Sequence, residues 1–367
     1  MKIYLEDLAL SRLCLGSTLL GSGGGGNPNI LRPILARTFP GTLRKVELTP
    51  IANLPDHATI AAVGMMGSPE LMEEDLPDGT EGVAAVRALE GALKRRIDYL
   101  LPLEGAGVNS IYPLLVAAKT GLPLIDGDGM GRAFPELQMT TLHIYGQRGT
   151  PFALINSAGE MIIFNDNDNF MLELNTRKTL MNSGGVGYFA GFAISGREAK
   201  ESIIPGTLSF LLELGSALEK GEYRKCLTAL TETTRNSLYG MAKELFIGTV
   251  TEIGHIEPLN LGSLALNGVK HYTNLTFNIL MQNENVLAYQ GDSVQAMVPD
   301  LICFLDYASG LPINNNEVSK GMELSVLGIP APNMLRTKRA LHVVGPQSFG
   351  YKQEYTPLEQ IHYEYYY

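Results

Sequence analysis

Residues 99–131 read YLLPLEGAGVNSIYPLLVAAKTGLPLIDGDGMG, and this stretch decides the fold. Its two short apolar runs, 99–103 and 122–125, are typical of buried strands. Between them, residues 111–120 have the apolar spacing of a helix, which Gly121 ends. Strand, helix and strand in this order predict a βαβ unit with parallel strands and a right-handed crossover.

Polar loops follow both of these predicted strands. Residues 104–110 (EGAGVNS) follow the first strand, and residues 126–131 (DGDGMG) follow the second. The carboxyl ends of parallel strands meet at one edge of a sheet, and open α/β sheets bind ligands at that edge. The sequence therefore places Glu104, Asp126 and Asp128 together at one candidate site.

The apolar patterns elsewhere predict an α/β part followed by a β-rich part. Helices are expected at 5–20, 29–38, 81–97, 166–181, 206–220 and 222–240. Short strands are expected at 43–48 and 59–63, and a hairpin at 152–164. After Phe246, β-like runs separated by Gly, Pro and Asn turns favour a barrel or sandwich: 248–253, 273–280, 286–289, 294–297, 301–305, 323–327 and 341–344.

These patterns divide the chain into four regions. Residues 1–170 form the α/β domain, and residues 171–245 are a helical or mixed segment that joins or completes it. Residues 246–355 form the β-rich, barrel-like domain, and residues 356–367 form a tail. A chain of 367 residues is long enough for two such domains.

Composition and charge exclude several classes of protein. The net charge is −10, whereas nucleic acids and anionic membranes need a basic surface, so neither is expected as a partner. The three cysteines lack Cys-x-x-Cys spacing and fit a reducing compartment. No apolar run approaches the roughly 20 residues that span a bilayer, and the first residues do not resemble a signal peptide. We therefore expect a cytoplasmic protein.

A glycine-rich loop, GSGGGGNP at residues 21–28, separates two helix-like stretches. Its glycines could bring backbone N–H groups close to an anionic or strongly polar ligand; the candidates are Gly23, Gly24, Gly25 and Gly26. A flexible connector is the alternative. The spacing matches neither a phosphate loop nor a dinucleotide fingerprint, so no nucleotide cofactor is expected and a nucleotide-dependent oxidoreductase is disfavoured.

Segments spread over nearly the whole chain resemble the S-methyl-thiohydantoin desulfurase family. They are 23–28, 65–69, 104–110, 126–140, 205–209, 282–285, 298–302 and 344–351, of which DGDGMGRAFPELQMT at 126–140 is the most specific. The resemblance implies a Rossmann-like, three-layer α/β/α N-terminal domain and a C-terminal domain that contains a β-barrel. It also implies a hydrolase that removes sulfur from a thiohydantoin-like ring, giving a hydantoin and a thiol or sulfide.

The family also occurs beside, or fused to, hydantoinase/oxoprolinase proteins. An alternative function is therefore that of a non-catalytic partner or accessory subunit of a hydantoinase-type enzyme. In the first case the ligand is a small cyclic amide or thiohydantoin, and in the second it is a protein. The sequence leaves homo-oligomer formation open.

Such a reaction needs a base for the attacking water, and Asp126 and Asp128 are the first candidates. Residues two apart on an extended segment point to the same side, so both carboxylates could hold one water or cation. Their repulsion in a half-buried site would raise the pKa of one of them toward neutrality. Turn aspartates are the alternative. Glu104 is either a third acidic group or a cap for the helix that starts near Ser110.

Other polar residues are candidates for binding the substrate. Asn109 could donate to a carbonyl or only turn its loop. Arg132 could clamp a carboxylate substituent or pair with Glu136, itself a candidate. The β-rich domain contributes three more candidates, Gln282, Asn283 and Glu284. They could contact the substrate or only form the polar side of a β-ribbon.

A divalent metal such as zinc or manganese would suit a mixed carboxylate and imidazole site, although nothing in the sequence requires one. The candidate ligands are Asp126, Asp128 and His143. The histidines are scattered and lack His-x-x-x-His spacing. His143 is the best candidate among them because it lies just after the 126–140 segment.

Overall fold

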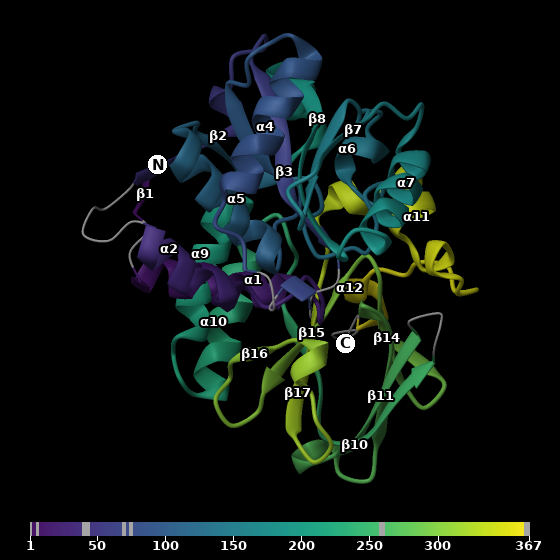
Figure 1. Cartoon of the computed structure of the whole chain (residues 1–367). Coiled ribbons are helices and arrows are strands. Elements are labelled where there is room, and N and C mark those ends of the chain that lie inside the picture. Colours follow the sequence, from purple (N-terminus) through teal and green to yellow (C-terminus); the bar gives the residue numbers. More distant parts are fainter. Residues whose placement is uncertain are drawn as a thin grey trace.

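The computed structural model describes residues 2–4, 7–38, 45–67, 71–72, 76–256 and 261–362. Two large sheets organise these residues (Figure 1). The first belongs to an α/β part, drawn at the top of Figure 1, and the second lies below it in green and yellow. The mixed α/β class predicted from the sequence is confirmed.

The first sheet has nine strands and a parallel centre. Its strands are β1 (Lys2–Tyr4), β2 (Lys45–Pro50), β3 (Thr59–Gly67), β4 (Tyr99–Pro102), β5 (Leu124–Asp128), β6 (Phe152–Asn156), β7 (Met161–Phe164), β8 (Val186–Ser195) and β9 (Ile204–Pro205). They lie in the order β1-β2-β5-β4-β3-β8-β6-β7, with β9 paired to β5. Strands β2, β5, β4 and β3 are parallel, and the other pairings are antiparallel.

The predicted βαβ unit forms at the centre of this sheet. Strands β4 and β5 pair in parallel at Leu100 and Leu124, and α5 (Val108–Thr120) connects them. Gly121 ends the helix with φ 77°, in the left-handed region where glycine is favoured. The second strand is longer than predicted, so Asp126 and Asp128 lie within β5 rather than in the loop after it.

Six of the remaining described helices, at 7–20, 32–38, 80–93, 169–181, 207–218 and 223–235, agree with the sequence pattern, and the other four were not predicted. The ten are α1 (Asp7–Leu20), α2 (Arg32–Thr38), α4 (Thr80–Leu93), α6 (Thr141–Ile144), α7 (Asn169–Met181), α8 (Gly196–Ser202), α9 (Thr207–Leu218), α10 (Tyr223–Arg235), α11 (Lys338–Val344) and α12 (Leu358–Ile361). In the described part of the chain, none has both the length and the apolar character needed to cross a bilayer.

The second sheet has eight strands, and all of its pairings are antiparallel. Its strands are β10 (Lys243–Ile256), β11 (Leu261–Gly268), β12 (Thr276–Gln282), β13 (Glu284–Gln290), β14 (Ser293–Met297), β15 (Leu301–Asp306), β16 (Pro312–Ile313) and β17 (Glu323–Ile329). The order is β14-β13-β12-β11-β10-β17-β15-β16. Among the described residues no pairing joins β14 to β16, so this order does not show a closed barrel.

Strand β15 shows how this sheet attaches to the α/β part. Cys303 and Leu305 belong to the large core that extends through the α/β part, whereas the alternate residues Ile302 and Phe304 belong to a second apolar cluster within the sheet. Successive side chains of a strand point to opposite faces. Both faces of β15 are therefore buried, which explains its unbroken apolar sequence.

One predicted strand needs correction, and some of the observed strands were not predicted. Residues 341–344 lie in helix α11 and not in a strand, because the Thr337 side chain accepts a hydrogen bond from the Ala340 N–H and caps the helix. Strands β8 and β11 were not predicted. Strand β8 pairs with β3 and β6, so region 171–245 contributes directly to the first sheet. Residues 363–367, the end of the predicted tail, lie outside the described residues.

Candidate functional site

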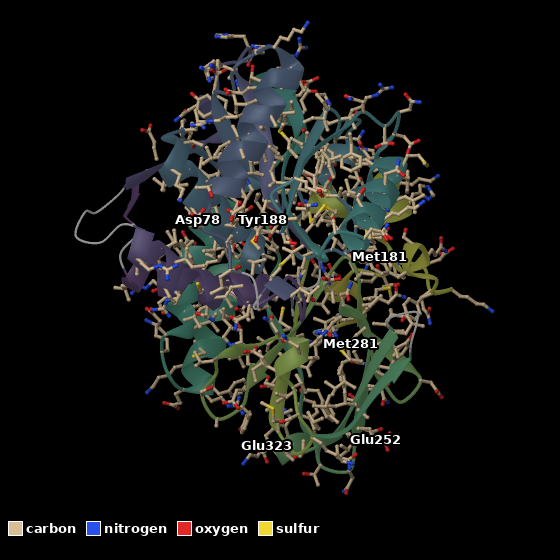
Figure 2. All side chains as sticks on the ribbon, viewed as in Figure 1. Asp78, Met181, Tyr188, Glu252, Met281 and Glu323 are labelled. Carbon is tan, nitrogen blue, oxygen red and sulfur yellow. The ribbon has the colours of Figure 1, made fainter. Side chains whose placement is uncertain are left out.

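A cavity of about 1140 Å³ lies between the α/β part and the second sheet. Met181 of α7 and Met281 of β12 mark its two sides (Figure 2). Its polar and glycine lining includes residues predicted to form the site, namely Gly23, Gly24, Gly25, Gly26, Glu104, Asn109, Glu136, Asn283 and Glu284. The glycine-rich loop, the loop after β4 and the turn before β13 therefore meet at one cavity.

Two buried glutamates face this cavity from different sheets. Glu104 follows β4 and is 7% exposed, and Glu284 begins β13 and is 5% exposed. The side-chain amide of Asn109 donates a hydrogen bond of 2.8 Å to Oε2 of Glu104. Oε2 of Glu284 has no hydrogen-bond partner within the described residues. An unpaired polar atom buried at a cavity is a feature expected of a ligand-binding site.

Asn109 positions Glu104 against the first sheet. Its Oδ1 accepts a hydrogen bond of 2.6 Å from the Met65 N–H, and its Nδ2 donates one of 3.0 Å to the Met65 carbonyl. The side chain is thus fixed to the end of β3 while it also holds Glu104. Glu104 does not cap α5, since the N-cap is Gly107 and no side chain caps the helix.

Burial raises the pKa of both glutamates. The pKa of Glu104 is raised to about 8, mainly by burial and further by the charges of Glu284 and Asp128, while the hydrogen bond from Asn109 opposes the rise. Burial raises the pKa of Glu284 to about 7, and the nearby Arg132 guanidinium opposes it. Two carboxyl groups that titrate near neutrality at one cavity are typical of an acid–base site.

The glycine-rich loop lies between Glu284 and the start of α5. The Gly25 carbonyl accepts a hydrogen bond of 2.8 Å from the Val108 N–H. A Cβ at Gly24 would overlap the Glu284 carboxylate, and one at Gly107 would overlap the Gly25 carbonyl. Close packing against backbone therefore requires glycine at position 107, whereas a side chain at position 24 would have to displace the Glu284 carboxylate.

The same loop also provides hydrogen-bond donors. The N–H groups of Gly23, Gly25 and Gly26 donate to no acceptor in the described part of the chain. They remain candidates for binding a polar ligand, as predicted. However, the carboxylate of Glu284 lies against Gly24, so this loop is a poor place for an anion.

Asp126 and Asp128 point to the same side of β5, but that side faces the first turn of α9. Asp126 accepts hydrogen bonds from the backbone and the hydroxyl of Ser209, at 3.0 and 2.5 Å. Asp128 accepts one of 2.7 Å from the Thr207 hydroxyl. Carboxylates at a helix N-terminus also interact favourably with the helix dipole.

Asp128 also holds the 126–131 segment in place. Its Oδ2 accepts hydrogen bonds from the backbone N–H groups of Gly105, Met130 and Gly131, at 2.8, 2.8 and 2.7 Å. Burial raises the pKa of Asp128, and these hydrogen bonds and the one from Thr207 oppose the rise. The described residues that line the cavity include neither Asp128 nor Asp126.

We predict that Asp128→Asn lowers stability rather than catalysis. Asparagine keeps one acceptor oxygen but replaces the other with an NH₂ group, so buried N–H or O–H donors that now bond to the carboxylate lose their acceptor, and the free energy of unfolding should fall by about 1–3 kcal/mol. Chemical denaturation measures this loss, and turnover per folded molecule should stay within a few-fold of the unmodified protein. A loss of turnover above 100-fold with unchanged stability would instead place Asp128 in the chemistry.

Arg132 and Gln282 contact backbone rather than the cavity. Arg132 is fully buried and donates to the carbonyls of Ala133, Asp300 and Asn285, at 3.1, 2.8 and 3.1 Å. It therefore attaches the 126–140 segment to the second sheet. Its donors bond to backbone carbonyls, it does not line the cavity, and it makes no ion pair with Glu136. Gln282 donates to the Phe349 carbonyl at 2.8 Å.

The predicted metal ligands do not come together. Nδ1 of His143 lies 3.1 Å from Nδ2 of Asn169, and its ring packs edge-on against Phe170. Both aspartates are held by the first turn of α9. Within the described residues, no group of three or more His, Cys, Asp or Glu side chains is arranged to hold a metal ion. As they are arranged in the described part of the chain, these donors do not form a site for zinc or manganese.

The cavity also contains polar residues that were not predicted. Glu173 and Arg177 line it from α7, and Asn314 and Asn315 line it from the loop after β16. The side-chain Oδ1 atoms of both asparagines lack a partner among the described residues. The run Asn314-Asn315-Asn316 could have indicated these residues from the sequence, since consecutive asparagines are typical of turns and loops.

The chain matches two domain models of one family and is similar to a solved structure. Residues 8–166 match the family described as "S-Me-THD-like, N-terminal domain", and residues 166–358 match "S-Me-THD-like, C-terminal domain". A crystal structure of a protein from Chromobacterium violaceum is similar to the chain with a TM-score of 0.82 and 25% identity, over 98% of this chain and 100% of that one. The search of curated proteins gave no match. The two family matches span most of the chain, which therefore belongs to the S-methyl-thiohydantoin desulfurase-like (S-Me-THD-like) family.

Proposed function

We propose that the chain is a hydrolase that removes sulfur from a thiohydantoin-like five-membered ring, with Glu104 and Glu284 as its acid–base pair. The observation that carries this proposal is the pair itself, two buried carboxyl groups with raised pKa values at one cavity. The family name supports the class of substrate.

The reaction replaces a carbon–sulfur bond by a carbon–oxygen bond. Water attacks the ring carbon that carries the sulfur, the carbon–sulfur bond breaks, and an S-methyl substrate gives a hydantoin and methanethiol. The attacking water loses a proton to a base, and the leaving sulfur gains one from an acid. Ring and water together supply all atoms, so no oxidant or reductant is needed.

The two glutamates suit these roles at neutral pH. Glu284, with the lower pKa of about 7, is the group that ionises first and acts as the base. Glu104, with a pKa of about 8, keeps its proton and acts as the acid. Because the charge of Glu284 raises the pKa of Glu104, the two groups titrate as a coupled pair.

The cavity also matches the hydrogen-bonding groups of a hydantoin ring. Such a ring presents both N–H donors and carbonyl acceptors. Asn314 and Asn315 supply side-chain oxygens that have no partner within the described residues, and Gly23 and Gly25 supply N–H groups. A ring that satisfies these buried groups gains affinity over a ligand that cannot.

The test is product release by the purified chain. Incubation with 2-(methylthio)hydantoin should release methanethiol and hydantoin in equal amounts, followed by a thiol reagent and by mass spectrometry. A matched 2-thiohydantoin should release sulfide if the thione is also a substrate. The accessory-subunit alternative would be supported if the purified chain by itself released neither methanethiol nor sulfide. Turnover would then appear only after a hydantoinase-type protein was added.

A further inference from the structure

We propose that the outward side of α7 is a dimer interface, on which α7 of a second copy of this chain packs antiparallel, about a two-fold axis near Leu174. Helix α7 lies at the periphery of the α/β part (Figure 1). The inference does not depend on the proposed function, because it concerns the surface of this helix and not the chemistry of the cavity.

The outward side of α7 is apolar although it faces solvent. Phe170, Met171, Leu174 and Met181 are 56%, 43%, 58% and 80% exposed. They are four of the 13 large apolar side chains exposed in the described part of the chain, although α7 contains only 13 of the 367 residues. Single exposed apolar residues are normal, whereas a group of them on one element marks an interaction site.

The opposite side of α7 packs on the first sheet. Leu172 and Leu180 are buried there. A Cβ at Gly149, just before β6, would overlap Leu172, and one at Gly187 on β8 would overlap Leu180. A helix packed in this way normally presents polar and charged residues to solvent. The apolar outward side is therefore additional to what the core of the chain requires.

The charges at the two ends of α7 favour a second copy as the occupant. The Asp168 carboxylate caps the N-terminus by accepting a hydrogen bond of 2.8 Å from the Met171 N–H, and Lys178 lies in the last turn. In an antiparallel pair centred on Leu174, Lys178 of one copy lies opposite Phe170 of the other. Its ammonium can then approach both that ring and the nearby Asp168 carboxylate. The helix is thus complementary to itself, as a two-fold interface requires.

Phe170 is held in position within the single chain. Its ring packs edge-on against His143, with the ring centroids 5.3 Å apart. Nδ1 of His143 lies 3.1 Å from Nδ2 of Asn169, which fixes the imidazole in turn. An aromatic side chain that is already ordered loses little conformational entropy on binding and suits the anchor of an interface.

The size of the interface sets the expected affinity. Helix α7 has 13 residues and is about 20 Å long. Specific interfaces bury about 800 Å² on each partner, and a pair of helices of this length lies at the low end of that range. We therefore expect dimers to form at micromolar rather than nanomolar concentrations.

The oligomeric state of the purified chain tests the inference. Analytical ultracentrifugation at micromolar to hundred-micromolar concentrations should show a monomer–dimer equilibrium. Leu174→Glu should weaken the dimer by about 100-fold or more, because it places unpaired charges at the centre of the interface. Leu8→Glu makes the same change on α1, at a side chain that is 55% exposed, and should leave the equilibrium unchanged. A chain that stays monomeric, or a dimer that tolerates Leu174→Glu, would overturn the inference.

A cysteine at position 174 tests the two-fold axis. Cys14, Cys226 and Cys303 are buried, so a cysteine introduced on the surface reacts in preference to them. Leu174→Cys should form a disulfide with its own counterpart under mild oxidation, because the two side chains meet at the axis. Leu8→Cys should not. Equal cross-linking of the two variants would contradict the antiparallel arrangement.

The charged ends of the helix provide a third test. Lys178→Glu should weaken the dimer about fivefold, because the new carboxylate lies opposite Asp168 of the second copy. Adding Asp168→Asn, which keeps a capping side chain but removes the charge, should recover most of this loss. If the second change recovers nothing, Asp168 and Lys178 do not meet and the proposed arrangement is wrong.

Discussion

Glu104→Gln is expected to lower kcat for thiol release by about 10²- to 10⁴-fold, the usual contribution of a general acid or base. Glutamine has nearly the same shape, and its carbonyl oxygen can still accept the hydrogen bond from Asn109. It cannot release a proton to the leaving group. Steady-state assays with 2-(methylthio)hydantoin at pH 7.5 would measure the loss.

A matched variant separates this effect from a general loss of a carboxylate. Glu201→Gln makes the same change in the exposed pair of Glu201 with Arg197, whose charged atoms are 3.9 Å apart, and should leave kcat unchanged. If Glu104→Gln retained more than about a tenth of the activity, Glu104 would not be the acid.

The same variant is expected to be more stable than the unmodified protein in alkaline solution. Burial raises the pKa of Glu104 from 4.5 to about 8 and that of Glu284 from 4.5 to about 7. Both groups are acids with a raised pKa in the folded state, so the folded protein binds protons more tightly than the unfolded chain does. Stability therefore falls as pH rises through the window between 4.5 and about 8.

Glutamine carries no charge at any pH, so Glu104→Gln removes this loss. The free energy of unfolding at pH 8 should rise by about 2–4 kcal/mol, and the difference should disappear near pH 4. Denaturant titrations at several pH values would show the trend. If Glu104→Gln were less stable than the unmodified protein at pH 8, the folded protein would favour the ionised form of Glu104, which contradicts a raised pKa.

The sequence predicted the parallel centre of the fold because its signals are local. Residues 99–131 carry the strand, helix and strand pattern, and Gly121 ends the helix as expected. The longer β5 could not be predicted, since Asp-Gly-Asp reads as a turn. Its pairing with β9, Gly127 with Pro205 and Asp128 with Ile204, extends the strand through a contact distant in sequence.

The candidate site also depends on contacts between residues distant in sequence, which the sequence pattern does not predict. Alternation along a strand correctly put Asp126 and Asp128 on one side, but only the tertiary structure puts the first turn of α9 there, with Thr207 and Ser209 as partners. The family resemblance makes Glu284 a candidate for substrate binding. Its place near Glu104 depends on how the second sheet docks on the first, and no periodicity or spacing encodes that docking.

The pH dependence of kcat/KM tests the account most directly. For the unmodified protein we expect a maximum between two limbs, near pH 7 for ionisation of the base and near pH 8 for loss of the acid's proton. In Glu284→Gln, residual activity should lose the lower limb, and its upper limb should move to lower pH because the charge that raises the pKa of Glu104 is gone. A profile that is flat across neutral pH, or limbs that stay in place in Glu284→Gln, would contradict the coupled pair.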